Sequence, residues 1–267
     1  MGIEALVFDV DGTIADTEEA HRQAFNDAFD EHRLGWHWTR SGYADLLAVS
    51  GGRERMRRHL DSLALPAPEM AALAERIPDV HETKVRIYRA LVESGRVPLR
   101  AGIRRLIDEA RDAGLKLAIA TTGTASGVEA LIAHTLGASA PGWFQVFAAG
   151  NHVAQKKPAP DIYRLVLRML GAPPSACVAF EDSGNGVAAA HAAGLFVVAT
   201  PSFWTLDQDF SGADLLLPTL GDPQRPIPEA IAARHTGGAP FVTLAWLETR
   251  VAQSRVREIE QPSLRSA

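Results

Sequence analysis

The fold is first indicated by Phe8-Asp9-Val10-Asp11-Gly12-Thr13, in which two aspartates follow the apolar run of residues 5–8. A short, uninterrupted apolar run is typical of a strand buried on both faces of a parallel sheet. Asp9 and Asp11 would then lie just past the carboxyl end of that strand, where open α/β sheets bind ligands. Two carboxylates separated by one residue repel each other unless a cation or a proton lies between them. The stretch therefore predicts a parallel strand that ends in a ligand-binding acidic turn.

The composition is that of an ordinary globular protein. The 267 residues are 46% hydrophobic and 22% charged, and the net charge of −5 gives no reason to expect nucleic acid or an anionic membrane surface as a partner. No apolar run approaches the ~20 residues that span a bilayer, and the start of the chain lacks the basic region of a signal peptide. A single cysteine, Cys177, fits a reducing compartment. We expect a cytoplasmic monomer, or a protein of a plastid-like compartment if a transit peptide has been removed.

The region from residue 17 to residue 96 predicts a helical domain. Apolar residues recur at helical spacing, and Gly and Pro residues separate the segments. The expected helical segments are 18–29, 46–47, 56–65, 70–77 and 85–92. Because no buried-strand pattern occurs here, we predict a helical cap domain over 17–96, inserted into a core domain made of residues 1–16 and 97–222.

From residue 97 onward, strand and helix patterns alternate, which indicates an α/β fold with a doubly wound parallel sheet. Short buried runs predict strands at 117–120, 144–149, 176–180, 195–199 and 215–217, and amphipathic runs predict helices at 103–113, 128–136, 161–170 and 187–193. The proline-rich residues 223–267 predict a C-terminal extension. It would contain one helix, from Val242 to about Val256, and a frayed tail from Glu258.

Polar residues follow four of the predicted strands, and a parallel sheet would bring them to one edge. These residues are Asp9 and Asp11, Thr121, Lys157, and Glu181 with Asp182. Each of them alone also suits a structural role, such as a helix cap or a solvated charge, but four successive strand ends together predict a site.

The chemistry of this set is that of phosphoryl transfer. Several clustered carboxylates suit an oxygen-ligated, partly hydrated Mg²⁺, and Lys157 with the Thr121 hydroxyl would hold phosphoryl oxygens. A carboxylate beside a metal-bound phosphate can attack phosphorus to give an acyl phosphate. A second carboxylate can protonate the leaving group and later accept a proton from water.

These motifs resemble those of the haloacid-dehalogenase-like phosphohydrolases. The matching residues are Asp9-Val10-Asp11-Gly12-Thr13, Thr121, Lys157-Pro-x-Pro-Asp-x-Tyr163 and Glu181-Asp182-Ser183. The resemblance implies a Rossmann-like core with a helical cap, and Mg²⁺-dependent transfer through an aspartyl phosphate. Asp9 would be nucleophile and metal ligand, Asp11 acid/base and ligand through its carbonyl, Asp182 a ligand, and Glu181 a ligand or the partner of one. Because dehalogenases lack the second aspartate, Asp11 favours phosphate chemistry.

Within that superfamily, the chain is most similar to the CbbY-type sugar-phosphate phosphatases, relatives of β-phosphoglucomutase. The matching stretches are Asp16-Thr-Glu-x-x-His21, Trp36-His37-Trp38, Leu46-Leu-x-Val-Ser-Gly-Gly-Arg-Glu54 and His81-x-x-Lys84. The chain departs from the usual pattern at Ala101, at Gly123 and at Asn151-His152. The resemblance implies that xylulose-1,5-bisphosphate, an inhibitory side product of Rubisco, is hydrolysed to xylulose 5-phosphate.

Eight residues are predicted to bind this phosphosugar: Glu18, His21, Tyr43, Gly51, Gly52, Arg53, Lys84 and Thr122. Arg53 follows a Gly-Gly turn at an expected helix start, which suits a second, non-transferred phosphate, and Lys84 would assist it. The resemblance places Glu18 and Tyr43 near sugar hydroxyls. It places His21 where it would orient Asp11 or close the hinge.

Two rival functions use the same residues. A β-phosphoglucomutase-like phosphosugar mutase would move the phosphate between carbons without releasing it. A non-catalytic sugar-phosphate sensor would bind the ligand and not turn it over, although the full set of catalytic side chains is present.

Overall fold

The computed structural model describes residues 2–260 of the chain. A parallel sheet of six strands forms its centre, in the order β3-β2-β1-β4-β5-β6. The strands are β1 (Ala5–Phe8), β2 (Lys116–Ala120), β3 (Val146–Ala148), β4 (Cys177–Glu181), β5 (Phe196–Ala199) and β6 (Leu215–Leu216). The predicted α/β fold with a doubly wound, Rossmann-like sheet is confirmed, with strand ends that differ from the predicted ones by at most two residues.

Side chains that alternate along the strands supply two hydrophobic layers, one on each face of the sheet. Leu6 and Phe8 pack toward α5 (Ile103–Asp112), α6 (Ala125–Leu136) and the C-terminal helices. Ala5 and Val7 face the other layer, where α7 (Asp161–Leu170) and α8 (Gly184–Ala192) pack. Because both faces are covered, every residue of β1 and β4 is buried, which explains the continuous apolar runs of residues 5–8 and 177–180; Glu181, the last residue of β4, is buried as well.

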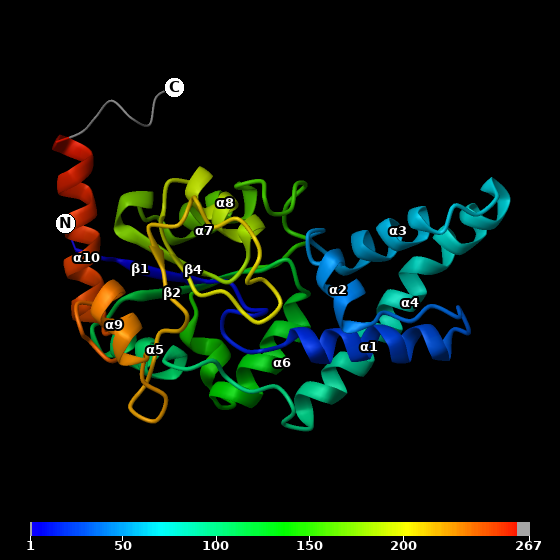
Figure 1. Ribbon diagram of the computed structural model, residues 1–267, viewed down its shortest axis with the longest axis horizontal. Helices are drawn as coiled ribbons and strands as arrows, with labels where there is room; N and C mark the ends of the chain where they lie inside the picture. The colour runs from blue at the N-terminus through cyan, green and yellow to red at the C-terminus, as the bar shows by residue number, and fades with distance from the viewer. Residues whose placement is uncertain (1, 261–267) are drawn as a thin grey trace.

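The first four of the five helices between β1 and β2 form the cap at one end of the molecule (Figure 1). They are α1 (Glu18–Glu31), α2 (Arg40–Leu46), α3 (Gly52–Ser62) and α4 (Ala67–Glu93). Trp36 and Trp38 are buried in the hydrophobic cluster of this cap, together with Phe25 and Phe29. Their role is therefore packing.

The cap corrects one prediction. The expected segments 70–77 and 85–92 belong to one helix, α4, which continues through Pro78. A proline inside a helix costs ~3 kcal/mol. Ile77 and Val80, on either side of it, are both buried in the cap cluster, and this packing holds the helix together.

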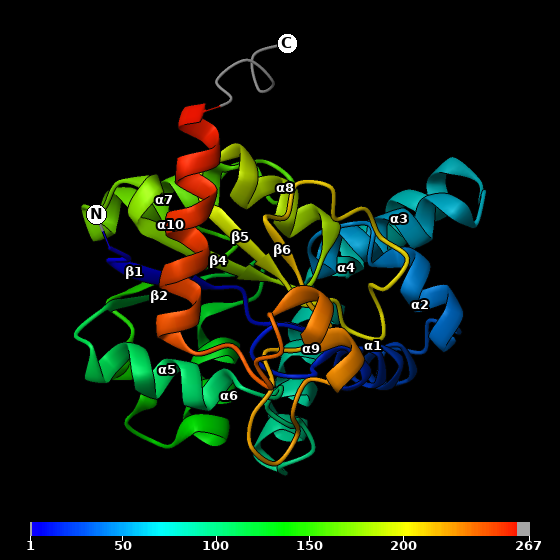
Figure 2. The same cartoon turned by 60° about the vertical axis from the view of Figure 1, so that its left-hand side comes forward.

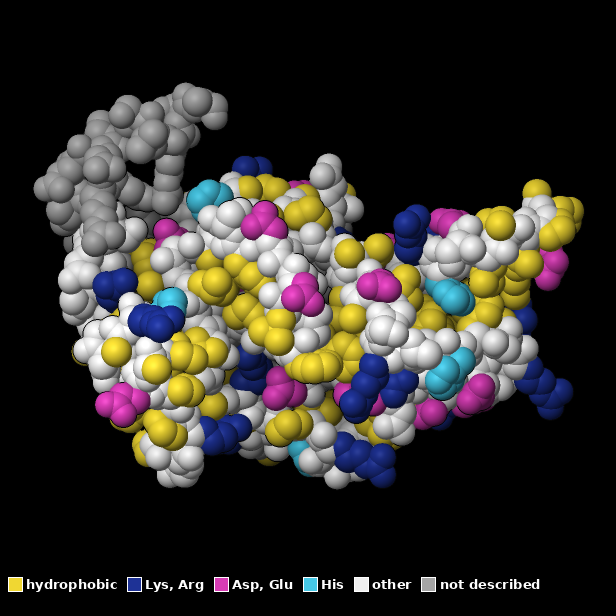
Figure 3. All heavy atoms as spheres, in the orientation of Figure 1, with side chains coloured by type: hydrophobic (Ala, Val, Ile, Leu, Met, Phe, Trp, Pro, Cys, Tyr) yellow, Lys and Arg dark blue, Asp and Glu magenta, His cyan; other side chains and the backbone are white. Residues whose placement is uncertain are grey.

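The C-terminal extension lies at the end of the core that faces away from the cap, as the two views show (Figures 1 and 2). It contains α9 (Glu229–His235), which the sequence did not predict, and α10 (Leu244–Glu260). The predicted tail begins inside α10, because residues 258–260 are helical; residues 261–267 lie outside the described residues. Residues 2–260 contain no helix with the length and apolarity to cross a membrane. Acidic and basic side chains are interspersed on the face shown in Figure 3.

Candidate active site

Three buried carboxylates meet at the carboxyl ends of the two central strands. Asp9 follows β1, Glu181 ends β4, and Asp182 comes directly after it. One oxygen from each lies within 4.8 Å of the others. The strands pair in parallel, with Phe8 opposite Phe180, and this register brings the three side chains together as the sequence predicted.

Lys157 is the cation inside this cluster. Its Nζ donates hydrogen bonds to Asp9 Oδ1 at 2.7 Å, to Glu181 Oε1 at 2.6 Å and to the Ala120 carbonyl at 2.8 Å. Burial disfavours its charge, but attraction to the two carboxylates outweighs burial and raises the pKa of Lys157. Burial also raises the pKa of Asp9 well above its usual value, and the Lys157 charge offsets only part of this.

Glu181 is held mainly by the protein itself. Its Oε1 accepts hydrogen bonds from Lys157 and, at 2.5 Å, from the Tyr163 hydroxyl. A β-carbon at Gly186 would lie 1.8 Å from its other oxygen, so α8 packs directly against it. Of its two predicted roles, this favours support of Lys157 and the ligands over direct ligation.

The set of donors fits a hard cation. Asp9 and Asp182 offer only oxygen, in a buried place with excess negative charge, and such sites suit Mg²⁺. Gly12 has a φ of +82°, and a β-carbon there would lie 2.1 Å from Asp182 Oδ2. Only glycine therefore allows the loop after β1 to close against this carboxylate.

A second chain of polar contacts runs from Asp11 into the cap. His21 Nε2 lies 2.9 Å from Asp11 Oδ1, and His21 Nδ1 lies 2.7 Å from Lys84 Nζ. Because an ammonium can only donate, Nδ1 accepts and Nε2 carries the proton that faces Asp11. Burial raises the pKa of Asp11, but His21 and, less strongly, Thr17 and Lys84 outweigh burial and hold this pKa well below its usual range.

Lys84 is buried rather than solvated. Its ammonium lies 4.7 Å from the centre of the Phe25 ring and 5.0 Å from that of Tyr88, so cation–π contacts accompany its bond to His21. The sequence predicted Lys84 as an aid to a second phosphate. The structure places it at the inner wall of the cap, behind His21.

A large cavity between core and cap joins these groups. Its volume is about 850 Å³, and Asp9, Asp11, Lys157 and Asp182 line it from the core. Of the other predicted residues, seven line it as well: Glu18, His21, Gly51, Gly52, Arg53, Lys84 and Thr122. The cavity is bridged by Lys156, whose Nζ lies 2.6 Å from Glu54 Oε1 of the cap.

Besides Glu181, two predicted residues do not line the cavity. Tyr43 is fully buried and donates a hydrogen bond to Glu18 Oε2 at 2.7 Å, so it supports Glu18 instead of facing the cavity. Thr121 is buried, and its hydroxyl accepts a hydrogen bond from the Gly123 N–H at 3.0 Å. Direct contact of either with a substrate stays a prediction.

The comparisons with known proteins agree with this geometry. A family model described as haloacid dehalogenase-like hydrolase matches residues 3–194. The chain belongs to this family. It is 51% identical to protein CbbY of Rhodobacter capsulatus over 220 residues, which cover 82% of this chain and 95% of that protein.

Solved structures of the family extend the comparison. CbbY from Rhodobacter sphaeroides is 47% identical, and the match covers 81% of this chain and 94% of that chain. TM-scores are 0.75 for its complex with phosphate and 0.76 for a variant in complex with xylulose-(1,5)bisphosphate. β-Phosphoglucomutase from Clostridium difficile covers 96% of this chain and 100% of its own, at a TM-score of 0.70 and 19% identity, and shares the fold. The chain is a phosphatase of the haloacid dehalogenase-like family.

Several residues of this phosphatase line the cavity without having been predicted as site residues, and Arg55 is one of them. Its guanidinium donates to the Tyr43 hydroxyl at 3.1 Å and to the Val49 carbonyl at 3.0 Å, and it lines the cavity. The predicted anion-binding residue, Arg53, is exposed at the cavity's edge. Arg55 is thus the arginine that the cap fixes toward the cavity.

Chelation of Mg²⁺ is expected to lower the melting temperature more at pH 8.5 than at pH 6.5. Burial and the neighbouring Glu181 raise the pKa of Asp182 to about 8, so at pH 6.5 the metal must displace a proton. Mg²⁺ affinity should then be at least about tenfold weaker at pH 6.5, which removes roughly 1.4 kcal/mol of stabilisation. Thermal melts with Mg²⁺ or EDTA at both pH values test this; an equal shift at both would contradict it.

Replacing Lys84 with methionine is expected to stabilise the fold near neutral pH. Burial lowers the pKa of Lys84 from 10.5 to about 8, and attraction to Asp11 offsets only part of this. Between these two values the unfolded chain binds more protons, so this lysine makes wild-type stability rise with pH. Below pH 8 the buried lysine is charged, so the full free-energy cost of burying that charge applies. We expect the free energy of unfolding of the variant to exceed that of wild type by about 1–3 kcal/mol there.

Urea unfolding of wild type and Lys84→Met at pH 7.5 and 9.5 measures this gain. The gain should shrink at the higher pH, where the wild-type lysine is neutral in the folded protein. A variant that is less stable at pH 7.5, or a difference that does not depend on pH, would show that the charge of Lys84 is not a cost to the fold.

Proposed function

We propose that this phosphatase removes one phosphate from a sugar bisphosphate, and that its substrate is xylulose-1,5-bisphosphate, with xylulose 5-phosphate as product. The observation that carries the proposal is the two-ended cavity: the acidic cluster with Lys157 lies in the core, and Arg53, Arg55 and Lys84 line the cap side. Hydrolysis of a bisphosphate needs a nucleophile and cationic groups around the phosphate that is removed, and a second cationic site for the phosphate that stays. The R. sphaeroides CbbY variant with xylulose-(1,5)bisphosphate, 47% identical, supports the choice of sugar.

In the proposed mechanism, Asp9 is the nucleophile. Lys157 holds Asp9 Oδ1, so Oδ2 is the oxygen that attacks phosphorus; the new O–P bond forms as the bond to the sugar oxygen breaks. Asp9 and Asp182 would also hold Mg²⁺, which supplies positive charge that neutralises the phosphoryl oxygens when bound.

Asp11 is the general acid and base of the proposed mechanism. As a carboxylic acid it gives its proton to the departing sugar oxygen, and as a carboxylate it then regains one from the water that attacks phosphorus of the aspartyl phosphate. His21 keeps this carboxyl ionised in the protein without substrate, so it must take up the first proton when the negative charge of the bound phosphate raises its pKa. The hydrogen bond from His21 Nε2 at 2.9 Å fixes its carboxylate and ties it to the cap. This contact links proton transfer to the arrangement of cap against core.

The proposal is tested by measuring phosphate release with Mg²⁺ from xylulose-1,5-bisphosphate, ribulose-1,5-bisphosphate, β-glucose 1-phosphate and glucose 1,6-bisphosphate. We expect kcat/KM for the xylulose compound to exceed the others by at least about 100-fold, since distal phosphate contacts contribute several kcal/mol to transition-state binding. Similar values across the panel would overturn the substrate, and the absence of phosphate release from all four would favour a sensor.

A further inference from the structure

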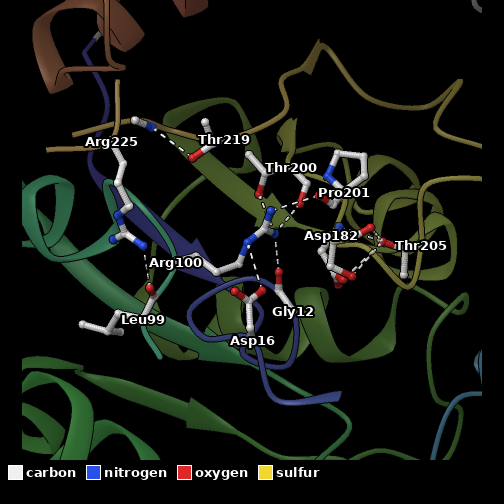
Figure 4. Close-up of polar contacts among 12 residues, drawn as sticks. Gly12, Asp16, Leu99, Arg100, Asp182, Thr200, Pro201, Thr205, Thr219 and Arg225 are labelled. Atoms are coloured by element: carbon white, nitrogen blue, oxygen red, sulfur yellow. Dashed lines mark hydrogen bonds and ion pairs between the residues drawn. The ribbon is translucent and has the colours of Figure 1, made fainter. Parts of the chain in front are cut away.

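Arg100 lies where the chain returns from the cap to the core. Beside it, Leu99 pairs with Ala15 in an antiparallel bridge, and the Arg100 N–H donates to the Ile14 carbonyl at 3.0 Å. The residue is thus fixed next to the loop that carries Asp9 and Asp11. Its side chain, only 12% exposed, points into the core between two loops (Figure 4).

The guanidinium of Arg100 joins two segments that are far apart in the sequence from each other and from Arg100 itself. Nη1 donates to the carbonyls of Gly12 and, at 2.5 Å, Thr200, and Nη2 donates to the Pro201 carbonyl at 2.9 Å. Nε lies 3.6 Å from Asp16 Oδ1 in the first linker to the cap. Carbonyl oxygens can only accept, so this one side chain satisfies several shielded acceptors that lie in different loops.

Both loops that Arg100 holds lie against Asp182. Gly12 packs so closely that a β-carbon there would lie 2.1 Å from Asp182 Oδ2. The loop after β5 begins with Thr200 and Pro201 and carries Thr205, whose hydroxyl donates to the same oxygen at 3.3 Å. Any relative shift of the two loops would therefore move the surroundings of this carboxylate.

We propose that Arg100 is a positioning residue: it holds the loop after β1 and the loop after β5 in the relative geometry that lets Asp9 and Asp182 bind a divalent cation together. The inference rests on the proposed function, in which that cation assists the removal of a phosphate. The positioning role depends on the shape of the guanidinium, because its planar set of N–H donors reaches carbonyls in both loops at once. A lysine ammonium would keep the charge and lose this geometry.

The test compares Arg100→Met and Arg100→Lys with wild type in calorimetric Mg²⁺ titrations without substrate. We expect Mg²⁺ affinity to fall about 10–100-fold in both variants, the usual cost of removing a partner that orients metal ligands. In steady-state assays, kcat at limiting Mg²⁺ should fall and recover with added Mg²⁺, whereas KM for the sugar phosphate should stay near the wild-type value. Arg225→Met is the matched control, because Arg225 is exposed and also donates to the linker, at the Leu99 carbonyl; its Mg²⁺ affinity should be unchanged.

Wild-type Mg²⁺ affinity in Arg100→Met would overturn the proposal. Full recovery in Arg100→Lys would also overturn it, because charge alone would then suffice. Failure of both variants to fold would assign Arg100 to stability and overturn it as well. If the wild type releases no phosphate from any sugar phosphate but the variants bind Mg²⁺ more weakly, the proposed function fails and the positioning role stands.

Discussion

Replacing Asp9 with asparagine is expected to reduce phosphate release by at least about 10⁴-fold, the scale of loss when a nucleophile is removed. Asp9 is the carboxylate that Lys157 fixes at 2.7 Å, at the end of the central strand. The amide has the same shape and can still accept that hydrogen bond, but it cannot attack phosphorus. The loss should therefore appear in kcat.

The fold of this variant should survive. Burial raises the pKa of Asp9, so its charge is costly to the folded protein, and Lys157 keeps Glu181 as a partner. Asp79→Asn is a suitable control, because Asp79 is exposed in α4 of the cap. A folded Asp9→Asn protein with more than a few per cent of wild-type activity would exclude Asp9 as nucleophile.

Replacing Lys157 with methionine is expected to damage stability and activity together. The change leaves Asp9, Glu181 and Asp182 buried without their internal cation, and breaking a buried charge pair costs about 3–5 kcal/mol. The loss of a fixed positive charge at the phosphoryl group should lower kcat by about 10²–10³-fold. Denaturant unfolding and phosphate release measure the two effects.

The adjacent lysine supplies the control for stability. Lys156 pairs with Glu54 at 2.6 Å, but both side chains are partly exposed, so Lys156→Met should change the free energy of unfolding by less than about 1 kcal/mol. The Lys157→Met deficit should also be smaller at pH 5.5 than at pH 9, because the carboxylates with raised pKa are more fully protonated at the lower pH. Equal changes in the free energy of unfolding for the two substitutions would show that Lys157 does not offset the negative charge of the buried carboxylates.

The sheet and the core half of the site could be predicted because their sequence signals are local. Each central strand is a continuous apolar run, and polar residues follow directly at its carboxyl end. In a parallel sheet this order alone brings Asp9 and Asp182 to one edge, and the loop between β3 and α7 brings Lys157 to them there. Tertiary packing then sets only the distances between these side chains.

The cap could be predicted less well because its contacts depend on how helices pack. By helical spacing, Arg53 lies nearer than Arg55 to the buried stripe of Met56 and Leu60, yet Arg55 is the arginine held inward, by Tyr43 of α2. The burial of Lys84 depends likewise on rings from α1 and α4. Pro78 predicted an interruption of the helix, but α4 continues through this residue because the helix is packed in the cap.

The most direct test of the account is a ³¹P NMR time course of xylulose-1,5-bisphosphate with the Mg²⁺-loaded protein. The account predicts loss of one of the two phosphate-ester signals, with one equivalent each of inorganic phosphate and xylulose 5-phosphate, and no reaction with Asp9→Asn. New phosphate-ester signals without inorganic phosphate would instead show a mutase, and unchanged signals with bound ligand would show a sensor.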